Sequence, residues 1–328
     1  MLSYPYEHTR RAAGPGKERG FMERFLNELV ERTRPRTGEG RAAAYIPELK
    51  KQDPSLLGVD LLRPDGSHLS AGDWDVPFTI QSIIKPVILL LALMDNGIAG
   101  VRRCIGVEAT GRPFDAINLS GETLSPQHFN PMVNMGAILL CTQLRGRDYG
   151  ERFDRLLALT RKLAGSDAIA VDEAVYRSEK ATGSKNRALC YLLKANGLIG
   201  DPAEAVLDCY FRACSIRVTC RDLSRIAMVL ASHGRSCLGA GGAPLFPEEY
   251  GRFVNAILTT CGMYDGSGDF AVRVGVPAKS GVGGGILAVA PGRLGIGIFG
   301  PALDERGNSV AGTALLEELS ARLGLSIF

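Results

Sequence analysis

The chain has 328 residues, a formal net charge of +3 and 45% hydrophobic residues. This length is sufficient for a large core in one or two domains. The small net charge, without a run of Lys and Arg, argues against a nucleic-acid partner. The longest apolar run, residues 87–94, is far shorter than the roughly 20 residues of a membrane span. Composition therefore indicates a globular protein and no membrane partner.

The first 20 residues are polar and basic, without the apolar segment of a secretory signal. We therefore expect a reducing, cytoplasmic location, in which most of the eight cysteines are small buried hydrophobic residues. The spacing of Cys209, Cys214 and Cys220 matches no zinc pattern, and the four histidines form no metal-binding array. We expect no metal and no cofactor.

The first third of the chain predicts a tail, a helix, two strands and a long apolar helix. Residues 1–20 are expected to be loosely ordered, and the apolar spacing over residues 21–34 predicts a helix. The turn signature Pro64-Asp65-Gly66 separates two short strands. The next helix runs from Ser82 to Asn96-Gly97, where the glycine suits a helix end.

The middle of the chain predicts an irregular stretch over residues 101–130 and a series of helices over residues 131–233. Residues 247–262 predict a further helix. After Gly262 the sequence is rich in Gly, Val and Ile with near-alternation, so residues 270–301 predict adjacent antiparallel strands. Residues 308–324 close the chain as an amphipathic helix.

These elements predict an α+β fold in which strands from both ends of the chain pair around a helical insertion. Residues 1–30 form the tail and first helix, partly disordered, and residues 31–328 form a single catalytic domain. Its sheet subdomain covers about residues 31–100 and 240–328, and its all-helical subdomain covers about residues 101–239. A cleft between two subdomains favours a small-molecule site.

Ser82 and Lys85 stand three residues apart at the front of the long apolar helix. This spacing brings the two side chains to one helical face. A serine hydroxyl needs an adjacent base to act as a nucleophile, and a lysine amine serves if burial or nearby positive charge lowers its pKa. Taken alone, the pair favours a simpler interpretation, a capping serine beside a lysine whose amine reaches solvent.

A second motif, Lys279-Ser280-Gly281, lies in a predicted strand of the C-terminal sheet. Enzymes of the penicillin-recognising superfamily carry such a strand beside a Ser-x-x-Lys helix. Lys279 would hold positive potential over the site. The backbone N–H groups of Val282 and Ser82 would bind an oxyanion. A Gly-rich hairpin with a solvated lysine is the simpler alternative, but it does not explain why both motifs occur in this order.

The chain resembles the serine-dependent glutaminases from about Tyr45 to the last helix. Seven segments carry the resemblance: YIPELKKQDP, FTIQSIIK, NPMVNMGAI, SEKATGSKNRALCYLL, CYFRACSI, CGMYDGSGDFA and AKSGVGGGI. The resemblance implies a β-lactamase/D,D-peptidase-like fold, with an antiparallel sheet flanked by helices plus an all-helical subdomain. It also implies hydrolysis of L-glutamine to L-glutamate and ammonia. We expect a homodimer or homotetramer.

The resemblance also implies a role for each matched residue. Ser82 corresponds to the nucleophile, Lys85 to its base, and Tyr45 and Tyr264 to two active-site tyrosines, of which Tyr264 is better suited to protonate the departing ammonia. The residues that correspond to substrate-binding positions are Ser82, Asn134, Glu179, Asn186, Tyr210, Tyr264 and Val282. A carboxylate such as Glu179 suits an α-ammonium group, and amides and a phenol suit the other polar groups of glutamine. Considered singly, each of these side chains is also compatible with a structural role.

Two segments depart from the family pattern. Pro86 follows the lysine directly and supplies no N–H for the first helical turn, and GVEATGRPFDA, around Asp115, replaces a different family sequence. If Pro86 displaces the Lys85 amine, the protein would bind glutamine with weak turnover. Another serine-reactive acyl hydrolase of the same fold, such as a β-lactamase or an amidase, is the remaining alternative.

Overall fold

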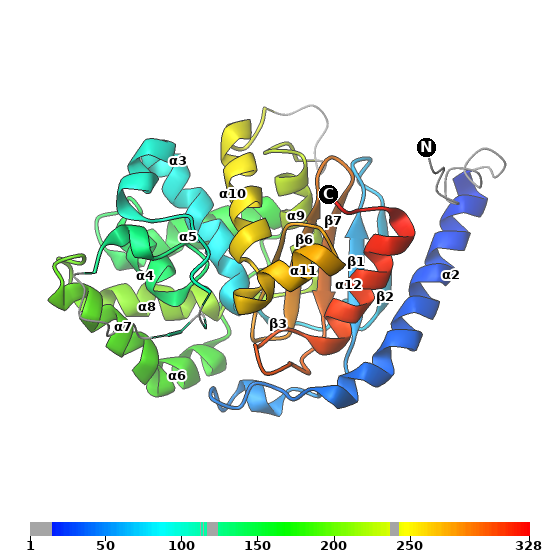
Figure 1. Cartoon of the computed structure of the whole chain (residues 1–328), viewed down its shortest axis with the longest axis horizontal. Helices are drawn as coiled ribbons and strands as arrows, with labels where there is room; N and C mark the ends of the chain where they lie inside the picture. The colour runs from blue at the N-terminus through cyan, green and yellow to red at the C-terminus, as the bar shows by residue number, and fades with distance from the viewer. Residues whose placement is uncertain (1–14, 112, 114, 117–123, 237–242) are drawn as a thin grey trace.

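The computed structural model describes residues 15–111, 113, 115–116, 124–236 and 243–328. Figure 1 shows an antiparallel sheet with helices on both faces beside a group of helices. Five of the described strands form one sheet in the order β2-β1-β7-β6-β5. Their bounds are β1 (Gly58–Leu62), β2 (His68–Gly72), β5 (Ala278–Ser280), β6 (Gly285–Ala290) and β7 (Leu294–Phe299).

The sheet joins the two ends of the chain. β1 pairs antiparallel with β7, with Gly58 opposite Phe299, and β7 pairs with β6. β1 also pairs with β2 across the turn at Pro64-Asp65-Gly66. The expected pairing of strands from both ends around a helical insertion is therefore confirmed.

Helices cover both faces of the sheet because the strands carry apolar side chains in both directions. Helix α9 (Cys220–Ala231) packs against β7, β6 and β1. Gly295 and Gly297 of β7 permit this close approach, since a Cβ at either position would lie 2.0 Å from a carbonyl oxygen of α9. On the other face, α2 (Pro15–Thr33) and α12 (Val310–Leu323) bury a second apolar cluster with Ile296 and Ile298.

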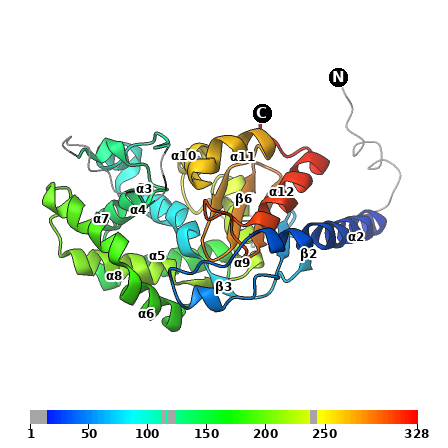
Figure 2. The same ribbon diagram turned by 60° about the horizontal axis from the view of Figure 1, so that its bottom comes forward.

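The helical part comprises five helices among the described residues. They are α4 (Asn134–Thr142), α5 (Tyr149–Ala164), α6 (Glu173–Thr182), α7 (Ser184–Ala195) and α8 (Ala203–Cys214). Two of them begin at side-chain caps, Asp148 for α5 and Asp172 for α6. Outside this group, Thr219 and Asp222 form a capping box at the start of α9, a helix start that the sequence indicates. Figure 2 shows α6, α7 and α8 at the end of the molecule remote from α2.

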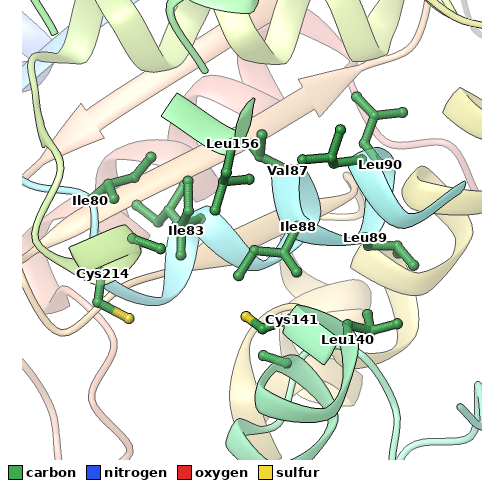
Figure 3. Packing of buried hydrophobic residues seen from close by; sticks show 14 of the residues in the cluster. Ile80, Ile83, Val87, Ile88, Leu89, Leu90, Leu140, Cys141, Leu156 and Cys214 are labelled. Carbon is green, nitrogen blue, oxygen red and sulfur yellow. The ribbon is translucent and has the colours of Figure 1, made fainter. Parts of the chain in front are cut away.

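Helix α3 (Lys85–Cys104) connects the two parts. Its apolar side chains are buried, with Ile88 and Leu89 near Leu140 and Cys141 of α4 (Figure 3). The residues Gln81–Cys104 are long and apolar enough to cross a membrane, but 72% of the apolar window is buried inside the protein, as in the core helix of a globular domain. Gly97, at φ 68° and ψ 170°, interrupts the helix where the sequence predicted its end, and a further stretch continues to Cys104.

Two sequence-based expectations are wrong. The segment after Gly262 does not begin with a strand, because its first part forms α11 (Ser267–Arg273). Phe270 and Val274, four residues apart, are buried, whereas Val272 between them is 88% exposed, which is the pattern of a helix. The sequence pointed to a strand because valine is typical of strands. At the N-terminus, α2 begins at Pro15 rather than near residue 21. The expectation for residues 1–14 lies outside the described residues.

The remaining elements are one helix, a small second sheet and several 3-10 turns. The helix α10 (Glu248–Cys261) confirms the helix that the sequence predicts over residues 247–262. In the small sheet, β3 (Phe78–Thr79) pairs with β4 (Arg217–Val218), and the sequence did not indicate this pairing. The 3-10 turns are η1 (Arg34–Glu39), η2 (Leu49–Lys51), η3 (Gln81–Ile84), η4 (Pro126–His128) and η5 (Tyr264–Gly266).

Candidate active site

Ser82 lies in the 3-10 turn η3, just ahead of α3, and is 6% exposed. The preceding residue, Gln81, has a φ of 48°, a left-handed conformation that is rare for a residue with a side chain. Lys85 is the first residue of α3 and has helical dihedral angles, with its N–H bonded to the Ser82 carbonyl. Pro86 therefore falls in the first turn, where a missing N–H costs no helical hydrogen bond.

The Lys85 side chain is completely buried. Its Nζ donates to the carbonyl oxygen of Met132 at 3.0 Å and to Asn134 Oδ1 at 2.7 Å. Burial lowers the pKa of Lys85 to about 8, against the attraction of negative groups that include Glu179. An amine with this pKa is partly neutral near pH 7 to 8, so it can accept a proton.

Tyr264 lies beside Ser82 although it comes from the far end of the chain. It begins η5 after α10 with a φ of 56°, and its hydroxyl donates to the Ser280 carbonyl at 3.2 Å. Burial raises the pKa of the Tyr264 phenol well above its usual value, and the nearby Ser82 hydroxyl only partly opposes this effect. The phenol therefore remains protonated, and its hydrogen must turn away from the Ser280 carbonyl to reach a group bound at Ser82.

Three further candidates form a polar wall. Asn134 opens α4, Asn186 lies in α7 and Tyr210 lies in α8. Asn134 Nδ2 donates to Asn186 Oδ1 at 2.8 Å, and the Tyr210 hydroxyl donates to Asn134 Oδ1 at 3.3 Å. The fold thus brings together side chains that the sequence places on separate helices.

Glu179 of α6 is 5% exposed and lies within electrostatic reach of Tyr210 and Lys85. Gln81 Nε2 lies 3.5 Å from Glu179 Oε2, at the limit of a hydrogen bond. Burial raises the pKa of Glu179 to about 8, and the Gln81 contact and the Lys85 charge only partly oppose this effect. A buried carboxyl group of this kind would gain strongly from a bound cation.

Lys279 of β5 is completely buried next to Tyr264. Its Nζ donates to the Ser280 carbonyl at 2.6 Å and lies 4.2 Å from the centre of the Tyr264 ring. Burial, together with repulsion from Lys85, lowers the pKa of Lys279 well below its usual value. Because a lower pKa leaves the Lys279 amine less fully charged, it supplies less positive potential than the sequence predicts. The Lys279 amine contacts the ring of Tyr264.

The turn after β5 packs tightly on the Ser82 segment. A Cβ at Gly281 would lie 2.8 Å from the Ile80 carbonyl oxygen, and a Cβ at Gly283 would lie 2.4 Å from that of Thr79. Val282, between them, is 4% exposed. Among the turn and loop hydrogen bonds of the described residues, the Val282 N–H has no backbone acceptor, so it is a candidate donor to an oxyanion.

Tyr45 is the exposed member of the group. It is 58% exposed, in the loop before η2. The protein packed against part of the side chain, together with the nearby Tyr264 and Glu179, raises the pKa of the Tyr45 phenol. Tyr45 is therefore an exposed ring within electrostatic reach of two buried site residues.

A cavity of about 220 Å³ adjoins this group. Met132 and Tyr264 line it, together with Thr110, Asn130, Asp265 and Ser267, whereas Ser82 is not part of its lining. The cavity therefore borders the candidate site from the side of η5. No group of three or more His, Cys, Asp or Glu side chains that could hold a metal occurs within the described residues.

Sequence reasoning missed two residues that contact the site. The first is Gln81, whose side-chain amide contacts Glu179. The sequence did not indicate this contact, because it does not show that the backbone of Gln81 is left-handed. Cys214, which is buried, lies near Tyr210 and helps to raise the pKa of its phenol. The cysteine spacing drew attention to Cys214 only as a candidate metal ligand.

The fold is β-lactamase-like: an antiparallel sheet flanked by helices, with a Ser-x-x-Lys turn facing a Lys-Ser-Gly strand. The sequence profile of the glutaminase family matches residues 40–328. The chain belongs to the glutaminase family, and it is an enzyme that hydrolyses glutamine.

Individual relatives cover nearly the whole chain. A glutaminase from Clostridium tetani is 48% identical over 308 residues, which is 94% of this chain and 100% of the relative. A glutaminase from Clostridium botulinum is 49% identical over the same coverage. The crystal structure of a Bacillus subtilis glutaminase in covalent complex with 5-oxo-L-norleucine is 38% identical, with a TM-score of 0.84, and covers 92% of this chain and 98% of that one.

Proposed function

We propose that this enzyme hydrolyses L-glutamine through an acyl-enzyme on Ser82, with Lys85 as the general base. The observation that carries the proposal is the buried Lys85 amine, whose pKa is lowered to about 8 one helical turn from the Ser82 hydroxyl. Pro86 does not oppose this role, since it lies in the first turn and leaves Lys85 in helical conformation.

In the first step, Ser82 Oγ attacks the γ-amide carbon and its proton passes to the Lys85 amine. The negative oxygen of the tetrahedral intermediate accepts hydrogen bonds from the N–H groups of Ser82 and Val282. The C–N bond then breaks as Tyr264 donates its phenolic proton to the departing nitrogen, and the phenol is reprotonated from Lys85. Water attacks the γ-glutamyl ester in the second step, again with Lys85 as base, and releases glutamate.

Recognition of the amino acid follows from the charges around Ser82. Glu179 binds the α-ammonium group of glutamine, which compensates the cost of ionising a buried carboxyl group. Asn134, Asn186 and Tyr210 donate to the α-carboxylate and the side-chain amide. Tyr45 covers the open side of the bound substrate.

Lys279 supports Tyr264 from behind its ring. The Bacillus subtilis relative forms a covalent complex with 5-oxo-L-norleucine, which is consistent with a covalent intermediate in this family.

We further propose that residues 31–328 act as one catalytic domain, and that the enzyme is a cytoplasmic homodimer or homotetramer. Light scattering coupled to size-exclusion chromatography tests the oligomeric state, and cell fractionation tests the location.

Replacement of Ser82 by alanine tests the mechanism. We expect Ser82→Ala to lower ammonia release from glutamine by at least about 1,000-fold, because it removes the group that forms the covalent bond. Incubation with 6-diazo-5-oxo-L-norleucine should add mass to the wild type but not to this variant. Ser166→Ala, on the loop after α5, is the control. Full activity of Ser82→Ala, with an unchanged circular dichroism spectrum, would refute the mechanism.

A further inference from the structure

The carboxylate of Asp208 links helices α6 and α8, which carry two of the proposed substrate-binding residues. Asp208 Oδ1 accepts hydrogen bonds from the Tyr176 hydroxyl and from Lys180 Nζ, both in α6. Its Oδ2 accepts from Arg212 Nε at 3.1 Å, one turn further along α8. Lys180 Nζ also donates to the Tyr176 hydroxyl at 3.0 Å. One carboxylate thus joins two cations and a phenol across the helix pair.

Helix α6 buries few of its side chains. It has 10 residues, of which Val175, Tyr176 and Glu179 are buried. One of these three, Glu179, is a carboxyl group whose burial opposes ionisation. At its C-terminal end α6 touches α8 through Gly183, where a Cβ would lie 2.5 Å from the Phe211 ring. Because apolar burial is small, the polar contacts of Asp208 carry much of the attachment of α6 to α8.

The geometry connects this attachment to substrate binding. Lys180 follows Glu179 directly in α6, and Asp208 precedes Tyr210 by two residues in α8. Two residues apart on a helix, Asp208 and Tyr210 face different sides, so Asp208 faces α6 while Tyr210 reaches Asn134. Figure 2 shows α6 and α8 side by side, and the two helices are in contact.

We propose that Asp208 is a positioning residue that fixes Glu179 relative to Tyr210 and thereby sets the recognition of the substrate's α-ammonium group. This inference rests on the proposed role of Glu179. Asp208 itself does not touch the substrate. Loss of its charge leaves Lys180 and Arg212 facing each other without a shared anion, which favours separation of the two helices. Displacement of Glu179 by about 1 Å would weaken its contact with the ammonium group.

The test compares two substrates in Asp208→Asn, which keeps the shape of the side chain and removes its charge. The substrates are L-glutamine and 4-carbamoylbutanoate, which has the same amide and carboxylate but no α-amino group. We expect KM for glutamine to rise about tenfold, equivalent to about 1.4 kcal/mol, with kcat changed by less than about threefold. The kcat/KM for 4-carbamoylbutanoate should stay the same. Competitive inhibition by L-glutamate and by glutarate measures the same preference in binding.

Three further variants complete the experiment. Glu248→Gln removes an exposed ion pair with Arg252 within α10, far from α6, and should leave both substrates unaffected. Lys180→Met should reproduce the loss of preference for glutamine, and it decides the question if Asp208→Asn does not fold. Asp208→Glu, which restores the charge one methylene further out, should recover part of the preference.

Two results would overturn the inference. The first is an unchanged KM for glutamine in Asp208→Asn and Lys180→Met. The second is an equal loss for both substrates together with a lower melting temperature, which would show a purely structural role. Glu179→Gln separates failure of the inference from failure of its premise. If that variant keeps the preference for glutamine over 4-carbamoylbutanoate, the proposed role of Glu179 is wrong and the role of Asp208 falls with it.

Discussion

The amine of Lys85 lies 2.7 Å from the amide oxygen of Asn134, and this contact holds the proposed base in place before the substrate arrives. A neutral lysine amine has two N–H donors and one lone pair. The carbonyl of Met132 and the amide of Asn134 accept from the Lys85 amine and so fix its position. Asn134 therefore orients the proposed base as well as lining the proposed substrate site.

The lowered pKa of Lys85 predicts the pH dependence of the reaction. Lys85 must be neutral to accept a proton, so kcat should increase with pH up to about 8 and then level off. Glu179 must be ionised to bind an ammonium group and also has a pKa of about 8, so kcat/KM should rise more steeply than kcat in the same range. Initial rates between pH 6 and pH 9 measure both slopes. Lys85→Arg, which cannot lose its proton, should be inactive throughout, and a flat wild-type profile would contradict the role of Lys85.

Pro86 should be compatible with full activity. It occupies the first turn of α3, and its neighbour Lys85 already has helical dihedral angles. We expect Pro86→Ala to change kcat by less than about threefold and to lower the melting temperature by a few degrees through the loss of buried ring atoms. Leu90→Pro, in the interior of the same helix, should abolish folding. An increase in kcat of tenfold or more in Pro86→Ala would show instead that the proline displaces the base.

Gly283 should be essential for catalysis and less important for folding. A Cβ there would lie 2.4 Å from the Thr79 carbonyl oxygen, so alanine would push the turn that carries Val282 away from Ser82. We expect Gly283→Ala to lower kcat by about 100-fold, since loss of one oxyanion donor has an effect of this size. Gly200→Ala is the matched control, because nothing lies within 4 Å of a Cβ at that position. Equal kcat values for the two variants would exclude Val282 as an oxyanion donor.

Glu179 should destabilise the free enzyme at alkaline pH. Its pKa rises from 4.5 to about 8 on folding, so the folded state holds the proton more tightly than the unfolded state. The stabilising contribution of this group is complete below pH 4.5 and is lost as the pH rises to about 8. The melting temperature of Glu179→Gln minus that of the wild type should therefore increase as the pH rises from 4.5 to about 8. Glu204→Gln, on the exposed face of α8, provides the control, and a constant difference across pH would contradict the shift.

The motifs of the sequence pointed to the candidate site, and its periodicity predicted much of the fold. The order of Ser82, Asn134, Glu179 and Lys279 along the chain was informative because each lies in a segment that resembles a family segment. The helices of the middle of the chain were recognisable from their apolar spacing and from caps such as Thr219. The segment around Val272 was misread because β-branched residues occur in a short exposed helix.

Properties that arise only from three-dimensional surroundings could not be predicted. The left-handed backbone of Gln81 and Tyr264 depends on strands and turns far away in the sequence. The burial that lowers the pKa of Lys279 depends on packing from both parts of the chain. Asp208 gave no sequence signal, because a carboxylate on an amphipathic helix is ordinarily solvated.

The pairing of β1 with β7 has a consequence for the synthesis of this protein. Gly58 can pair with Phe299 only after Phe299 has left the ribosome, so the nascent chain carries an incomplete sheet until β7 has been made. Lys279 and Tyr264 are also made after the helical part, so the candidate site remains incomplete until β5 has been made. A truncation before Leu294 should leave an inactive polypeptide with exposed apolar strands that depends on chaperones.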